Sequence, residues 1–485
     1  MITRETILHE LQTPDRLTDS LRNTGFTLHM ARRKVEALKR CRETMERLVG
    51  KRAMGEMVGL WVPGRMEVLG KHTDYAGGDS ITFATELGFT AIVTARDDRR
   101  MTLRELASNR TDGETCGETC GETCGETYGE TCEFSIDEAE STLESLPAGD
   151  WRRYPLTVAR RLNANFRALR GVRLVFVSDL PRAAGMSSSS ALMILVAMAL
   201  IERNQLWENE TFRRNLRSRT DLANYLAVVE NGQSFGELVG ESGVGTFGGS
   251  EDHVAILASR AGTLRRYRYA PVRLIEELPL PTGYRFLVAD SGVVAEKTGA
   301  VRDRYNRASR LAAELAEHWR RITGRAQDRH LGDAFATTSI VLRILVENLV
   351  NHPEYDEECK SAWWNRLRHF ERESRIGIPT AMAALQRGDL RRFGDVVDDS
   401  QRAATELLGN QVPETIRLTE LARELGAVAA SAFGAGFGGS VWAMVEESQE
   451  TVFAQRWLRR YTEAFPKRTA RIYPVTAAPP AMILE

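Results

Sequence analysis

A strand, a loop of small residues and a long apolar helix are expected in succession between residues 172 and 201, and this succession constrains the fold most. The apolar run 172–177 is typical of a buried strand, and the run 192–201 of a buried helix. Between them, Gly185 and the serines 187–190 stand where the helix begins. Small residues let the backbone approach an anion, and the first-turn amides carry the positive end of the helix dipole. The pattern predicts an α/β domain with a phosphate-binding loop.

A second stretch, residues 62–78, combines a buried strand with a dense polar turn. Gly70 interrupts the strand, so the four residues after it can project from the turn. They are Lys71, His72, Thr73 and Asp74. Their side chains offer donors and acceptors to a polyhydroxylated ligand, although a polar hairpin without a ligand would have the same pattern.

A third stretch, residues 431–445, is rich in glycine. Gly434, Gly436 and Gly439 match the spacing of the dinucleotide-binding fingerprint, but the apolar run 441–445 that follows them is typical of a strand and not of the required helix. We therefore expect a glycine hairpin between two strands, whose backbone closely approaches a ligand or another loop.

Taken together and in this order along the chain, the polar turn, the serine-rich loop and the glycine hairpin resemble the GHMP small-molecule kinases, and among them the galactokinases. The serine-rich loop is similar to the phosphate loop Pro-x-Gly-x-Gly-Leu-Ser-Ser-Ser, with Ala183 in place of one glycine. The polar turn is similar to Pro-Gly-Arg-x-x-x-x-Gly-Glu-His-Thr-Asp-Tyr, and the hairpin to Gly-Ala-Gly-Phe-Gly-Gly. The resemblance implies an α/β (α+β) chain with the two-lobed GHMP kinase fold, and an active site in the cleft between the N- and C-terminal domains.

The apolar runs and the resemblance divide the chain into three parts. We expect an N-terminal helical extension over residues 1–54, an N-terminal domain over 55–278 and a C-terminal domain over 279–485. Strands are expected at 59–68 and 172–177, and helices at 28–48, 301–322 and 333–350. The tandem Gly-Glu-Thr-Cys repeat within 112–132 has too little apolar content to form a core, which predicts a disordered insertion between two strands.

The resemblance assigns the nucleotide to the phosphate loop. The residues expected to bind ATP are Ala183, Ala184, Gly185, Met186, Ser187, Ser188 and Ser189. It also implies that Ser189 and Glu230 hold Mg²⁺, an ion that prefers hard oxygen ligands. Glu230 could instead be a charge on a helix surface, because the interval between it and the next motif is longer than in typical galactokinases. The extra residues lie near 236–241.

The acid/base group implied by the resemblance is Asp252, in a segment similar to Cys-Gly-Ile-Met-Asp-Gln, with Glu251 as the rival. Asp252 would either accept the proton of a sugar hydroxyl or orient that hydroxyl while Arg65 stabilises charge. Gly249, in the same segment, is expected to contact the substrate together with residues 71–74. Tyr305 is the nearest match to the substrate tyrosine of the family, and a core tyrosine is the alternative.

Lys71 stands where galactokinases have a glutamate that faces the C6 hydroxyl of the sugar. A lysine there could bind a C6 carboxylate or phosphate, donate a neutral hydrogen bond, or point to solvent. If it faces a carboxylate, its replacement by glutamate would disfavour a uronate against galactose.

The expected function is an ATP- and Mg²⁺-dependent sugar 1-kinase, with galactose as the first substrate. The alternatives are a uronic-acid 1-kinase and a sugar- and ATP-binding sensor without turnover. The net charge is −1 over 485 residues, so the chain lacks the excess of positive charge that is typical of proteins that bind nucleic acid or an anionic membrane. No secretory signal is recognisable, and the longest apolar stretch, 191–201, is too short to cross a bilayer. We expect a cytoplasmic monomer.

Overall fold

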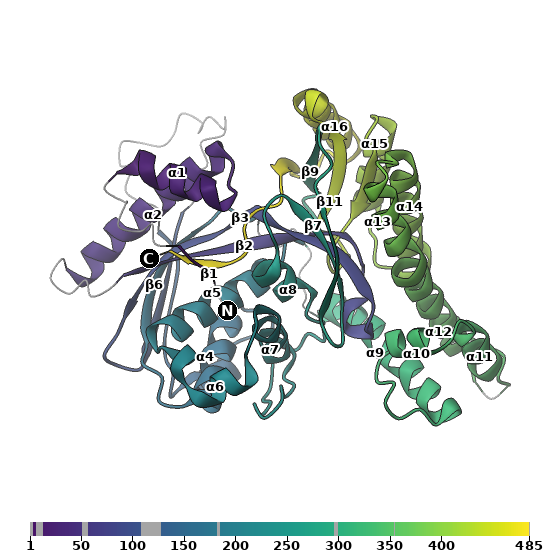
Figure 1. Cartoon of the computed structure of the whole chain (residues 1–485), viewed down its shortest axis with the longest axis horizontal. Helices are drawn as coiled ribbons and strands as arrows, with labels where there is room; N and C mark the ends of the chain where they lie inside the picture. Colours follow the sequence, from purple (N-terminus) through teal and green to yellow (C-terminus); the bar gives the residue numbers. More distant parts are fainter. Residues whose placement is uncertain are drawn as a thin grey trace.

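The computed structural model describes residues 3–5, 13–50, 57–107, 128–181, 185–294, 299–353 and 355–484. These residues form two lobes (Figure 1). The N-terminal lobe is built on a nine-stranded sheet, and the C-terminal lobe combines a four-stranded sheet with most of the later helices. This arrangement confirms the mixed helix and sheet architecture expected from the sequence.

Two long antiparallel strands, β2 (Val58–Leu69) and β3 (Asp79–Ala95), form the centre of the large sheet. Nearly all of their residues are buried, and apolar and β-branched residues predominate along them. The other strands of this sheet are β1 (Thr3–Glu5), β4 (Arg100–Leu106), β5 (Tyr128–Ser135), β6 (Val172–Ser178), β7 (Thr263–Arg268), β8 (Arg273–Pro279) and β13 (Met482–Leu484).

Helices cover both faces of this sheet (Figure 1). One face carries α1 (Pro14–Thr24) and α2 (Leu28–Val49). The other carries α3 (Ala139–Ser145), α4 (Arg153–Phe166), α5 (Ser188–Arg203), α6 (Glu210–Asn215), α7 (Arg219–Asn231) and α8 (Glu251–Ala258).

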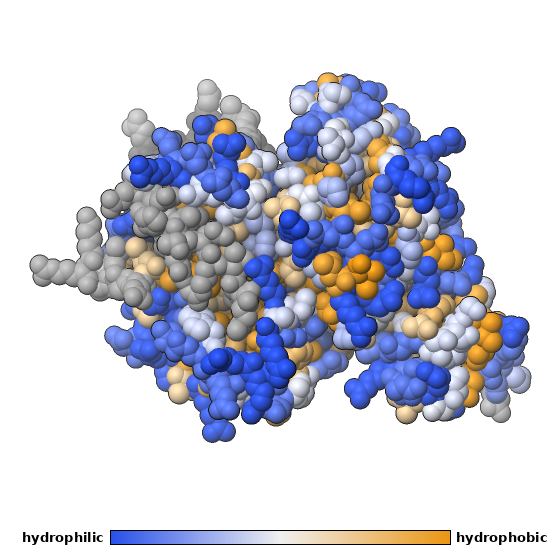
Figure 2. All heavy atoms as spheres, in the orientation of Figure 1, coloured by the Kyte–Doolittle hydropathy of each residue, from blue (hydrophilic) through white to orange (hydrophobic). Residues whose placement is uncertain are grey.

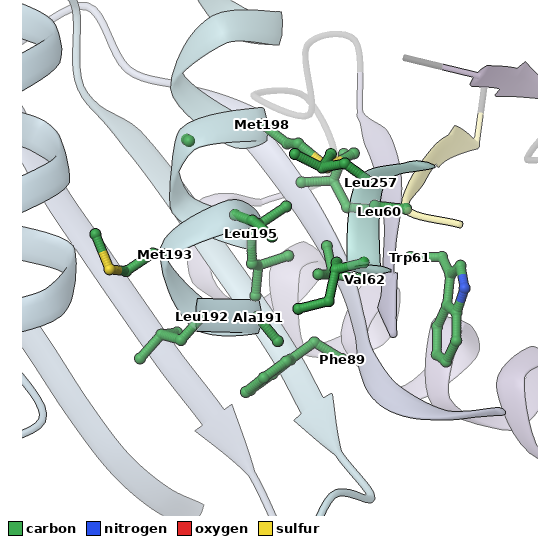
Figure 3. Close-up of a cluster of buried hydrophobic side chains, with 14 of the residues drawn as sticks. Leu60, Trp61, Val62, Phe89, Ala191, Leu192, Met193, Leu195, Met198 and Leu257 are labelled. Atoms are coloured by element: carbon green, nitrogen blue, oxygen red, sulfur yellow. The ribbon is translucent and has the colours of Figure 1, made fainter. Parts of the chain in front are cut away.

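Helix α5 is apolar on all sides because it lies inside the lobe, packed against β2, β3, α4 and α8. Figure 3 shows Leu195 of α5 close to Val62 and Leu60 of β2 and to Leu257 of α8. This packing holds the first turn of α5 in a fixed position at the end of the buried strands.

The C-terminal lobe has a small sheet in the order β10-β11-β9-β12. Its strands are β9 (Tyr284–Asp290), β10 (Ala429–Ala432), β11 (Ser440–Glu446) and β12 (Arg471–Val475). Its helices are α9 (Gly299–Thr323), α10 (Leu331–Thr337), α11 (Val341–Leu345), α12 (Glu357–Phe370), α13 (Ile378–Gln386), α14 (Leu390–Ala403), α15 (Pro413–Glu424) and α16 (Glu450–Ala464). The last strand, β13, returns to the large sheet and pairs with β2, so the chain ends on the N-terminal lobe.

The strands expected at 59–68 and 172–177 and the helices expected at 28–48 and 301–322 are confirmed. The single helix expected at 333–350 is wrong. Thr338 is extended, with φ −153° and ψ 151°, and separates α10 from α11. Two consecutive β-branched threonines, Thr337 and Thr338, disfavour helix at this point.

The expected disorder over 112–132 is also wrong in part. Residues 112–127 lie outside the described residues, but the last unit of the repeat belongs to β5, which pairs with β4. The thiol-bearing side chain of Cys132 is buried in the core, where its apolar contacts stabilise the strand. Burial raises the pKa of this thiol to about 11, so it is protonated at neutral pH.

Hydrophilic residues cover most of the face drawn in Figure 2, and hydrophobic residues appear there in small separate groups. Within the described parts of the chain, no helix is both long and apolar enough to span a bilayer.

Candidate active site

Arg65 joins three parts of the N-terminal lobe. From β2, its Nε donates to Oδ1 of Asp252 in α8 at 2.7 Å, and its Nη1 donates to the carbonyl of Gly185 at 2.5 Å. Burial alone would lower the pKa of Arg65, but the carboxylates of Asp252, Glu251 and Glu67 outweigh it and raise the pKa above its ordinary value. The guanidinium therefore stays charged beside the phosphate loop.

A cluster of oxygen atoms lies next to this ion pair. Oε2 of Glu230, in α7, accepts from the Ser190 hydroxyl at 3.3 Å, and Oε1 accepts from Thr246 at 3.1 Å. The Ser190 hydroxyl is also 3.4 Å from Oδ2 of Asp252. The side chain of Glu230 is mostly buried, so it is not a helix-surface charge.

The hydroxyl at this cluster comes from Ser190 and not from Ser189, the serine expected from the sequence. The side chain of Ser189 instead hydrogen-bonds to Tyr154 at the start of α4. Successive helical side chains point about 100° apart, so only one of two adjacent serines in α5 can face Glu230. The rotation of α5 about its axis decides which serine faces Glu230. A run of three consecutive serines in the sequence does not reveal that rotation.

The described part of the phosphate loop is held against the C-terminal lobe. Gly185 and Ser187 adopt positive φ angles of 77° and 57°. A Cβ on Gly434 would lie 3.0 Å from the carbonyl oxygen of Gly185, so the glycine hairpin between β10 and β11 closely approaches this loop. The hairpin is confirmed, and its close neighbour is another loop. Ala183 and Ala184 lie outside the described residues.

His72 is fixed in the polar turn after β2. Its Nε2 is 3.1 Å from the carbonyl oxygen of Ala435, and its Nδ1 is 2.8 Å from the Tyr75 hydroxyl. Because a carbonyl only accepts, Nε2 carries the proton and Nδ1 accepts from Tyr75. The centre of the His72 ring is 5.1 Å from that of the Tyr305 ring.

Asp74, Gly249 and Tyr305 lie together in one pocket. Oδ2 of Asp74 accepts from the backbone amide of Glu251 at 3.1 Å. A Cβ on Gly249 would lie 2.4 Å from the same oxygen, so glycine is required there. Tyr305 reaches the site from α9 and is buried.

Lys71 and Thr73 are buried and do not line the pocket that these residues form. The hydroxyl of Thr73 donates within the turn, to the carbonyls of Gly70 at 2.9 Å and Asp79 at 2.7 Å. Nζ of Lys71 donates to the hydroxyl of Ser400 in α14 at 3.1 Å. Lys71 is only 1% exposed, so it does not point to solvent. These two residues hold the turn in place.

One pocket collects most of the functional side chains. It is lined by Arg65, Glu67, His72, Asp74, Tyr75, Ser190, Ala227, Glu230, Asn231, Gly248, Gly249, Glu251, Asp252, His253, Tyr305, Gly434 and Ala435. Sequence reasoning missed Glu67 and Ser190. Glu67 follows Arg65 by two residues on the same strand, and the alternation of side chains along a strand is the signal that could have found it.

Glu67 and Glu251 form a buried acidic pair. Their carboxyl groups interact in the same pocket, although they come from β2 and α8. Burial raises the pKa of Glu67 to about 7 and raises that of Glu251 well above its ordinary value, and each is raised further by neighbouring carboxylates. Burial and mutual repulsion therefore favour a proton on the pair as pH falls toward 7.

Three family models match successive parts of the chain. The "Galactokinase galactose-binding signature" matches residues 54–95, the "GHMP kinases N terminal domain" residues 153–237 and "GHMP kinases C terminal" residues 381–463. These segments contain, respectively, the polar turn, the phosphate loop with α7, and the glycine hairpin.

Individual relatives agree with these matches. The chain is 26% identical to a galactokinase of Roseiflexus sp. over 417 residues, which is 85% of this chain and 89% of the relative. It is 25% identical to a galactokinase of Streptomyces coelicolor over 435 residues, 86% of this chain and 94% of the relative. The fold is similar to that of Lactococcus lactis galactokinase complexed with galactose, with a TM-score of 0.70, 21% identity and coverage of 92% of this chain and 99% of that one. The chain therefore belongs to the GHMP kinase family and is a phosphotransferase that uses an alcohol group as acceptor.

Proposed function

We propose that this protein is a galactokinase, which transfers the γ-phosphoryl group of ATP to the anomeric hydroxyl of galactose. The observation that carries the proposal is the Arg65–Asp252 ion pair, which lies between the first turn of α5 and the polar turn of residues 71–74. A phosphate-binding helix end and a sugar-binding turn on opposite sides of one charged pair suit phosphoryl transfer to a sugar.

The donor atoms fit Mg²⁺. Within the described part of the chain, no group of three His, Cys, Asp or Glu side chains could hold a metal without help. The carboxylate of Glu230 and the hydroxyl of Ser190 are hard oxygen donors, and Mg²⁺ is commonly held by one or two such groups together with waters and substrate phosphates. The ion, when bound, would neutralise charge on the phosphates. We assign Glu230 and Ser190 to it.

Asp252 is a better candidate for the acid/base group than its neighbour Glu251. In the proposed reaction, the anomeric oxygen forms a bond to the γ-phosphorus, the bond from that phosphorus to ADP breaks, and Asp252 accepts the hydroxyl proton. Burial and the neighbouring carboxylates raise the pKa of Glu251, and it lies beside Glu67, which makes Glu251 the poorer acceptor for the hydroxyl proton. Its side chain is also 6% exposed, against 21% for Asp252. Arg65 would stabilise the charge that develops on the transferred group.

The pocket favours a neutral sugar over a uronate. Among the described residues that line it, five carry carboxyl groups, Glu67, Asp74, Glu230, Glu251 and Asp252, whereas Arg65 is the single guanidinium or ammonium group. A C6 carboxylate would meet repulsion in a partly desolvated site. Lys71 donates to Ser400 and does not line the pocket, so its ammonium group does not contact a sugar bound there.

The test is MgATP-dependent ADP release by the purified protein with a panel of hexoses and uronates. We expect turnover with galactose and none above background with galacturonate. Turnover with galacturonate alone would support a uronic-acid kinase. Sugar and ATP binding without ADP release would support a sensor. Asp252→Asn serves as the control for contaminating kinases.

A further inference from the structure

A second cavity opens from the sugar side of the pocket. Its volume is about 660 Å³, within the roughly 300–1,000 Å³ typical of small-molecule sites. Six residues line both cavities: Asp74, Tyr75, Ala227, Asn231, Gly248 and Gly249. None of the described phosphate-loop residues lines the second cavity. It therefore continues the sugar site, on the side away from the proposed position of ATP.

The walls of this cavity combine aromatic rings with amide groups. Phe235, Phe247 and Tyr269 line it, and Phe247 is 47% exposed although it is a large apolar residue. The side-chain amides of Asn224 and Gln233 also line it and make no hydrogen bond to any described residue. Sugar rings present apolar C–H faces to aromatic rings and hydroxyls to amides, so these walls match the chemistry of a sugar ring.

Three of these side chains, Gln233, Phe235 and Phe247, come from the segment that connects α7 to α8. Described contacts hold this segment in place. Arg161 donates to the carbonyl of Gln233 at 2.6 Å, and the ring of Phe235 is 6.2 Å from that of Tyr225. The amide of Phe247 donates to Oδ1 of Asn306 at 3.1 Å. The segment is thus a fixed wall of the cavity.

We propose that the second cavity binds a further sugar ring attached to the hexose that is phosphorylated, so that the preferred substrate is a reducing disaccharide or longer reducing oligosaccharide. The inference rests on the proposed sugar 1-kinase activity. The anomeric hydroxyl must remain free beside Asp252, so the second ring is linked through a hydroxyl near Asp74 and Gly249, the residues common to both cavities. The chemical step is unchanged, since the same P–O bond breaks and the same proton moves to Asp252.

The experiment compares kcat/KM for galactose with kcat/KM for disaccharides that carry galactose at the reducing end, joined through different hydroxyls. We expect at least one disaccharide to be preferred by about 10-fold or more, as one well-packed aromatic contact with hydrogen bonds can supply. Gln233→Ala and Phe247→Ala should each lower kcat/KM for that disaccharide, mainly through KM, and leave kcat/KM for galactose within about 2-fold.

Val239→Ala is the matched control, because Val239 belongs to the same segment, is 69% exposed and does not line the cavity. It should change neither substrate. Phosphorylation of galactose but of no disaccharide would overturn the inference and leave the proposed function standing. So would equal effects of Gln233→Ala and Phe247→Ala on both substrates. Failure with every sugar would instead overturn the proposed function itself.

Discussion

Nε of Arg65 lies 2.7 Å from Oδ1 of Asp252, and this ion pair joins a central strand of the large sheet to the first turn of α8. The same guanidinium holds the carbonyl of Gly185 at 2.5 Å. A single side chain therefore sets the distance between the candidate acid/base group and the phosphate loop.

Replacing Asp252 tests its role directly. Asp252→Asn keeps the size of the side chain and an oxygen that can accept from Arg65, so we expect the fold and sugar binding to remain. Turnover should fall by roughly 10²-fold or more, the scale of a general-base or orienting contribution. ADP release near the wild-type rate would remove Asp252 from the chemistry, and Glu251→Gln would then be the next variant to measure.

The adjacent serines of α5, Ser189 and Ser190, provide a matched pair of variants that tests the proposed Mg²⁺ site. Ser190→Ala should raise the Mg²⁺ concentration needed for half-maximal activity by roughly 10-fold or more, because a hydroxyl next to Glu230 is lost. Ser189→Ala should change it little, since the Ser189 hydroxyl contacts Tyr154. The measurement is activity against free Mg²⁺ at saturating ATP. A larger effect at Ser189 would restore the assignment expected from the sequence.

The acidic pair predicts a pH dependence of stability. The pKa of Glu67 is about 7 in the folded protein because of burial, against about 4.3 in an unfolded chain. As pH rises through this window, the unfolded chain releases its proton first, so the free energy of unfolding falls. Glu67→Gln removes the titrating group and should make the fall between pH 5 and 7 smaller, by on the order of 1–3 kcal/mol.

Denaturant unfolding at several pH values checks this expectation. Glu36→Gln, at an exposed position of α2, is the control and should leave the pH dependence unchanged. An identical slope for wild type and Glu67→Gln would show that the pair does not hold a proton.

Lys71 is expected to act on stability and not on substrate choice. Lys71→Met keeps the length of the side chain but leaves the Ser400 hydroxyl without its donor and removes a positive charge near Glu67. We expect the free energy of unfolding to fall by about 1–3 kcal/mol. The ratio of kcat/KM for galactose to that for galacturonate should stay within error of wild type.

Lys467→Met, at an exposed position, is the control for the stability measurement. A change in the substrate ratio would return Lys71 to the specificity argument and would support contact between this residue and the C6 group of the sugar.

The sequence by itself determined the features that depend on neighbouring residues. The succession of strand, serine-rich loop and apolar helix, the turn after Gly70 and the glycine hairpin are all set by short-range periodicity and by the backbone freedom of glycine. The order of these motifs was enough to predict the family, the two lobes and the meeting of Arg65 with Asp252. A strand after the repeat was expected, but its extension back into the last unit of the repeat was not, because that extension depends on pairing with β4 and on burial of Cys132.

Only the tertiary structure decided the roles of residues that motifs leave open. Ser190 and not Ser189 faces Glu230 because packing of α5 fixes the rotation of the helix. Lys71 is bound to a residue 329 positions further along the chain. Glu67 meets Glu251 only when β2 and α8 pack together. Contacts between distant segments depend on how whole elements pack, and no local pattern in a single sequence encodes them.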